Sequence, residues 1–151
     1  MATTTDLARW MRDQHDRVDH LVDRLTERVA FVPRANREPW LKALVAEFEE
    51  FRANLEKHFA LEEKGGYLAS VLQARPGAHE EVDHLLAEHR EISRLLTAIF
   101  EEVSSLHPST PLHIRDMCCR VRNLIEVLDR HESHENMLVS YTITRDIGSH
   151  D

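Results

Sequence analysis

The chain has 151 residues, and its 27 acidic and 19 basic side chains give a formal net charge of −8. Hydrophobic residues make up 42% and charged residues 30%, which is typical of a water-soluble globular protein and excludes a disordered or membrane-embedded chain. The acidic balance, with no cluster of basic residues, argues against nucleic acid and anionic membranes as partners.

The length suits one domain over residues 1–151 that buries a single core. No apolar run approaches the roughly 18 residues that a membrane-spanning helix needs, and the first residues lack the apolar segment of a signal peptide. The two cysteines, Cys118 and Cys119, are adjacent in an expected helix, where their side chains point about 100° apart. We therefore expect inert core thiols and a cytoplasmic protein.

The first half of the chain predicts two helices. The first spans about residues 6–31, with apolar residues three or four positions apart, as on the buried face of an amphipathic helix: Leu7, Met11, Val18, Val22, Leu25 and Val29. The second spans 37–64, after Asn36 as N-cap, and ends at Gly65–Gly66. Its apolar residues are Leu41, Leu44, Phe48, Phe51 and Leu55.

The second half predicts two more helices, after a link in which Tyr67–Ala74 forms a short helical turn. They span about 78–106 and 111–145, and Thr110–Pro111 opens the latter. Short links join the first helix to the second and the third to the fourth, so each pair is antiparallel. The predicted fold is all-α, an up-down-up-down four-helix bundle.

The two halves repeat each other. At an offset of 74 the apolar residues of the first helix fall on apolar residues of the third, and at 73 those of the second fall on the fourth. Two amphipathic helices in phase agree to this extent anyway, so the polar residues are more informative. His15 falls on His89, His58 on His131, and Glu62 on Glu135.

These six residues lie on the apolar faces of their helices, so their side chains point into the bundle. A histidine and a glutamate four residues apart, as in His58–Glu62 and His131–Glu135, present both groups on one face. At about 1.5 Å per residue all four helices present them at one level, nearer the end with the termini and the 65–77 link. Six buried polar groups are costly without a partner, and a metal centre supplies one.

Four imidazoles and two carboxylates are too many ligands for one tetrahedral zinc and suit two ions, each with two histidines and both bridged by the glutamates. We expect two iron ions per chain. The predicted ligands are His15, His58, Glu62, His89, His131 and Glu135.

The motifs DQHDRVDHLVDRL, LEKHFALEEKGGYL, LAEHREISRLL and LDRHESHENML resemble those of the hemerythrin family, also called the HHE cation-binding domain, over nearly the whole chain. The resemblance implies a non-haem di-iron centre with oxo or hydroxo and carboxylate bridges. Oxygen-carrying hemerythrins have one more histidine on the third helix and an aspartate on the fourth, where this chain has Leu85 and Asn136. The pattern is more similar to the hemerythrin domain of repair-of-iron-centres proteins, linked to nitrosative stress, and to iron-sensing hemerythrin domains.

We therefore expect a protein that binds, senses or reacts with O2, NO or peroxide (H2O2) and that receives electrons from an unidentified donor. We expect it to be a monomer or a weak homodimer. Whether it turns over as an enzyme is left open. The alternative is a structural or regulatory bundle that holds zinc or manganese without redox turnover.

Several other residues have two interpretations. His134 and Glu63 flank the site as partners of ligands or as solvated side chains, and Tyr67 and Tyr141 either pack or hydrogen-bond a bound oxygen species. Trp10 is expected in the core. The remaining histidines are expected on the surface, at helix ends or in the tail: His20, His79, His84, His107, His113 and His150.

Overall fold

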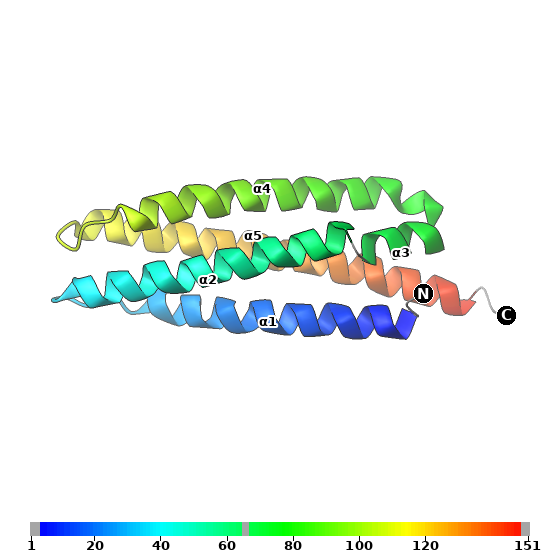
Figure 1. Ribbon diagram of the computed structural model, residues 1–151, viewed down its shortest axis with the longest axis horizontal. Helices are drawn as coiled ribbons and strands as arrows, with labels where there is room; N and C mark the ends of the chain where they lie inside the picture. The colour runs from blue at the N-terminus through cyan, green and yellow to red at the C-terminus, as the bar shows by residue number, and fades with distance from the viewer. Residues whose placement is uncertain (1–3, 65–66, 149–151) are drawn as a thin grey trace.

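The structure, a computed structural model, describes residues 4–64 and 67–148. Four long helices lie side by side, and the described residues contain no strand (Figure 1). The elements are α1 (Thr4–Ala30), α2 (Arg37–Lys64), α3 (Tyr67–Ala74), the 3-10 turn η1 (Pro76–Ala78), α4 (His79–Ser104) and α5 (Pro111–Gly148). In this part of the chain, no helix has the length and apolar character needed to cross a membrane.

The four long helices form the predicted up-down-up-down bundle. α1 and α4 each pack against both α2 and α5, so the helices are arranged in a ring. The links 31–36 and 105–110 lie at one end of the bundle, and α3 lies at the other end beside the start of α1 (Figure 1). The all-α fold class is confirmed.

The predicted boundaries differ from the observed ones by only a few residues. α1 begins and ends slightly earlier than expected, α4 ends at Ser104, and α5 continues to Gly148. The expected helical turn at Tyr67–Ala74 is α3. The predicted break at Gly65–Gly66 lies outside the described residues, as does His150.

One side chain connects the links 31–36 and 105–110 at the end of the bundle opposite α3. The guanidinium of Arg37 donates hydrogen bonds to the carbonyl oxygens of Pro33 (2.9 Å) and Pro108 (3.2 Å). Asn36, just before α2, has a φ of 53°, a left-handed conformation that asparagine tolerates better than most residues. Helix α2 therefore begins directly after Asn36, as predicted, but the left-handed φ of Asn36 differs from the extended conformation typical of an N-cap residue.

Two apolar clusters fill the bundle. The larger runs from the link end and includes Val18, Leu55, Ile92 and Leu128. The smaller lies at the α3 end and includes the following residues: Met11, Tyr67, Leu68, Val71, Val82, Leu85, Leu138 and Val139. The six predicted ligands fall between these clusters on all four long helices, so the fold places a polar layer inside an otherwise apolar core.

One packing prediction is wrong. Cys118 is buried, as expected of a core thiol, but Cys119 is exposed, and both are free thiols. Adjacent helical residues point about 100° apart, so a helix that buries Cys118 must turn Cys119 toward solvent.

Candidate metal centre

The structure brings all six predicted ligands together in the buried layer. His15, the most accessible of them, is 7% exposed, and both glutamates are fully buried. α1 and α4 each contribute one histidine, and α2 and α5 each contribute a histidine and a glutamate one helical turn apart. The apolar residues three or four positions away on each helix direct these polar side chains inward.

Each glutamate reaches histidines from both halves of the bundle. One oxygen of Glu62 lies against Nε2 of His58, and the other is 2.9 Å from Nε2 of His89. Glu135 Oε2 is 3.0 Å from Nε2 of His15. Its Oε1 is 2.6 Å from Nε2 of His131 and 3.3 Å from that of His89. The two carboxylates therefore bridge two pairs of histidines.

The donor atoms form two overlapping groups, and within each group they lie within 4.8 Å of one another. One group contains His15 and His58, the other contains His89 and His131, and both contain Glu62 and Glu135. Each group could hold a metal ion, and the two groups share both carboxylates.

Several of these atoms lack the hydrogen bonds that a metal-free core would require. Both oxygens of Glu62 and Nε2 of His131 are buried without a hydrogen-bond partner, although other donor atoms are close. Buried polar atoms are nearly always hydrogen-bonded, because burial without a partner costs a few kcal/mol. Donor atoms that converge without hydrogen-bond geometry fit a bound cation.

The electrostatics of the layer indicate the same requirement. Burial, and then the charge of Glu135, raises the pKa of Glu62 to about 12. Burial alone would raise the pKa of Glu135 too, but its contacts with His131 and His15 hold it well below its usual value. Without a metal the two carboxylates therefore carry a proton between them, and divalent cations would replace that proton.

The outward nitrogens of three of the histidines have separate partners. Nδ1 of His131 is 3.1 Å from a Glu88 oxygen, and Nδ1 of His89 is 3.3 Å from Glu63. Nδ1 of His58 is 3.4 Å from the Gln14 amide oxygen. Such contacts fix the ring so that Nε2 faces the centre.

Two of these partners were missed from the sequence, Gln14 and Glu88, because each contacts a histidine on a different helix. Glu63, for which the sequence left open a ligand partner or a solvated side chain, is exposed and contacts His89. His134 contacts Glu88 (3.1 Å) instead of a histidine of the centre. Gln14 and Glu88 occupy equivalent places in the repeat and each precedes a predicted ligand, which is the signal that could have identified them.

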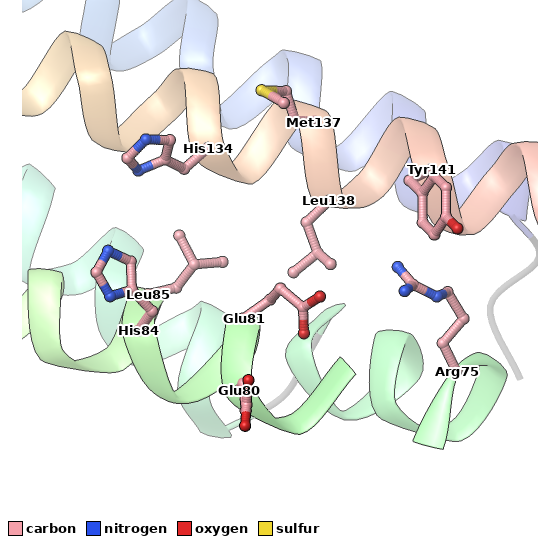
Figure 2. Close-up of a pocket in the computed structure, with 9 residues that line it drawn as sticks. All are labelled: Arg75, Glu80, Glu81, His84, Leu85, His134, Met137, Leu138 and Tyr141. Carbon is pink, nitrogen blue, oxygen red and sulfur yellow. The ribbon is translucent and has the colours of Figure 1, made fainter. Parts of the chain in front are cut away.

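The two tyrosines have different surroundings. Tyr67 is 1% exposed, and its hydroxyl has no hydrogen-bond partner. Burial and the charges of Glu135 and Glu62 raise its pKa far above the usual value, so it stays protonated. Tyr141 is exposed and lies in a surface cleft, where the Arg75 guanidinium is 4.1 Å from its ring centre (Figure 2).

Aromatic rings pack against the histidines on two sides of the layer. Phe59 stacks on His89 with ring centres 4.0 Å apart, and Trp10 is partly buried and stacks on His58 at 6.1 Å. The histidines expected on the surface, where described, are exposed: His20, His79, His84, His107 and His113.

Comparison with protein families gives one match. A family model described as the hemerythrin HHE cation-binding domain matches residues 6–142, which covers most of the chain and all six residues of the centre. Neither the curated proteins nor the solved structures give a match.

Proposed function

The chain belongs to the hemerythrin HHE cation-binding domain family, and from that premise we propose that it holds two iron ions and binds, senses or reacts with O2, NO or peroxide. The family is one of metal-binding helical bundles, and the buried histidine and glutamate groups of this chain fit that role. The observation that carries the proposal is that both groups share the same two carboxylates.

In this assignment His15 and His58 hold one ion, His89 and His131 hold the other, and Glu62 and Glu135 bridge them. Imidazole with carboxylate suits iron, manganese or zinc. Zinc has no redox chemistry, whereas iron exchanges electrons with O2, NO and peroxide. Each ion would receive two nitrogens and two bridging oxygens, which leaves positions open in an octahedral shell for a small ligand.

The residues around the centre prepare it for such a ligand. Tyr67 keeps its proton beside Glu135 and Glu62, so its buried hydroxyl is placed to donate a hydrogen bond to a small oxygen-containing ligand. Phe59 and the two apolar clusters keep bulk water away from the layer. The chain therefore supplies a fixed proton donor beside the layer.

The four histidines and two glutamates would hold the iron ions, and the chemistry that these ions would supply is electron transfer to a small molecule. Reduction of NO or O2 then needs an external electron donor to restore them. Disproportionation of peroxide needs none, because two molecules of H2O2 yield two of water and one of O2. Steady peroxide consumption without a reductant would indicate an enzyme, whereas a single stoichiometric colour change would indicate binding or sensing.

Metal content with an absorption spectrum tests the proposal most directly. Protein purified without added metal should contain about two irons per chain, as expected for two shared-carboxylate sites, with the near-ultraviolet and visible bands of a bridged di-ferric centre. Zinc or manganese in place of iron, with no iron uptake from ferrous solution, would contradict the iron assignment and favour the structural or regulatory alternative.

Removal of one histidine from each pair tests the ligand assignment. The double variant His58→Ala/His131→Ala should lose both irons, because each ion loses a nitrogen donor. The matched control is His20→Ala/His113→Ala, which removes two exposed histidines from α1 and α5 and should keep both irons. Full iron content in the first variant would overturn the assignment.

A further inference from the structure

A second group of metal-ligating side chains lies outside the buried layer. His84 and Glu88 on α4 and His134 on α5 each offer one donor atom, and these atoms all lie within 4.8 Å of one another. Both histidines are exposed, whereas Glu88 is partly buried. Figure 2 shows His84 and His134 on neighbouring helices at one end of a surface cleft of about 720 Å³.

The spacing of this group repeats that of the buried centre. His84 and Glu88 are four residues apart on one helix, as are His58 and Glu62. This spacing places an imidazole and a carboxylate on the same helical face. His134 completes the set from α5, with Nδ1 3.1 Å from Glu88 and its ring centre 6.1 Å from that of His84.

We propose that His84, Glu88 and His134 form a separate surface site for a divalent cation of the zinc, cobalt or iron(II) type. Two imidazoles and one carboxylate are a common ligand set for such ions, and the exposed face leaves room for water to complete the shell. Glu80 and Glu81 line the same cleft and make its potential more negative, which attracts cations. This site goes beyond the proposed function and does not depend on it.

Glu88 connects the surface site with the buried centre. One of its oxygens is 3.1 Å from Nδ1 of His131, and the other is 3.1 Å from Nδ1 of His134. A cation held by His84 and His134 would therefore share its carboxylate with a histidine of the buried centre. A hydrogen-bond partner of this kind tunes the basicity of a ligating histidine. Cation binding at the surface site would therefore change the metal affinity of the buried centre.

The other half of the bundle provides an internal comparison. The repeat places Trp10, Gln14 and Leu61 at the positions equivalent to His84, Glu88 and His134. That set has no imidazole and no carboxylate, although its backbone positions are alike. The surface site is therefore a property of these three side chains on α4 and α5, and the bundle architecture alone does not produce it.

Zinc binding to metal-free protein tests the proposal. After equilibrium dialysis against Zn2+, wild-type protein should hold one more zinc per chain than the variant His84→Gln/His134→Gln. Glutamine keeps both side chains polar at exposed positions, so the variant should fold, which circular dichroism checks. The matched control is His79→Gln/His113→Gln, which removes exposed histidines from the same two helices and should keep the wild-type count.

The His58→Ala/His131→Ala variant separates this proposal from the proposed function. It lacks the buried centre, yet it should still bind one zinc that the further changes His84→Gln and His134→Gln remove. Equal zinc counts with and without His84 and His134 would overturn the surface site, whatever metal the buried centre holds. Loss of the buried metal in the His84→Gln/His134→Gln variant would overturn it as a separate site.

Discussion

The two halves of the bundle, α1–α2 and α4–α5, present the same inward ligands in different surroundings. Behind His58, the outward nitrogen faces the neutral amide of Gln14 at 3.4 Å. Behind His131, the equivalent nitrogen faces the carboxylate of Glu88 at 3.1 Å. Burial lowers the pKa of His58 to about 4. Burial acts on His131 too, but Glu135 and Glu88 raise its pKa above the usual value.

The histidines of α1 and α4 differ in the same way. His89 stacks on Phe59, whereas the repeat places Glu132 at the position equivalent to Phe59, beside His15. The repeat therefore determines where donor atoms converge, and the residues that break the repeat determine the charge around each one. The two groups of donor atoms are therefore chemically unequal, although the residues that form them are nearly symmetric.

The largest effect is expected from the two glutamates of the metal-free protein, which are equivalent in the repeat, although Glu62 is neutral and Glu135 is negatively charged. Glu135→Gln should destabilise it by about 3–5 kcal/mol, because removing the anion leaves buried histidines without their partner. Glu62→Gln should cost about 1 kcal/mol or less, because Glu62 is already protonated at neutral pH and an amide resembles a neutral carboxyl group. Urea unfolding at pH 7 measures both. Equal losses would contradict the assignment of the shared proton.

A medium effect is expected from exchanging Glu88 and Gln14, the residues that contact the outward nitrogens of His131 and His58. Glu88→Gln should weaken metal binding by about 10- to 100-fold, because His131 loses the carboxylate that raises its basicity. Gln14→Glu should act in the opposite direction on His58. Competition with a chelator measures the affinity, and proton NMR of the metal-free protein should show the pKa of His131 falling and that of His58 rising. Unchanged pKa values of His131 and His58 in these variants would contradict the proposed difference between the two halves.

The helices and the inward faces were predictable because they depend on periodicity. Apolar residues three or four positions apart place Leu25, Phe48 and Leu124 in the core, and each of them is buried. The same phase places His15 and Glu135 inside, so the convergence of the ligands could be read from spacing alone. The helix ends shifted by a few residues because terminal turns depend on local hydrogen bonds that spacing does not specify.

The surroundings of the ligands were not predictable in the same way. Glu88 supports His131 across two helices, and such a contact depends on how α4 and α5 are rotated against each other. Its four-residue spacing from His84 was present in the sequence, but His84 was assigned to the surface by its angle from His89. That assignment is correct, since His84 is exposed, yet it concealed a second cluster of donor atoms.

The smallest effect is expected from Glu132, which has no counterpart in the other half. Burial and the charge of Asp19 raise its pKa to about 8, against the opposing influence of His15. In the unfolded chain Glu132 titrates near its usual value of 4.5, so the folded metal-free protein binds more protons between pH 4.5 and 8. Its contribution to stability is therefore lost as the pH rises through this window.

His58 has the opposite sign, since its folded pKa of about 4 lies below 6.5 and its contribution is lost as the pH falls. Glu132 is not among the groups that shift the pKa of His58, so His58 contributes alike to the wild type and to a Glu132 variant and cancels from their difference. Between pH 6.5 and 8, Glu132→Gln should flatten the pH dependence of unfolding free energy by at most about 1.4 kcal/mol per pH unit. Glu62, with its pKa raised to about 12, stays protonated in the folded state of both proteins throughout this window and cancels from the difference. Parallel slopes would mean that Glu132 is ionised in the fold, and His15 would then face a full negative charge at the position where His89 has the uncharged ring of Phe59.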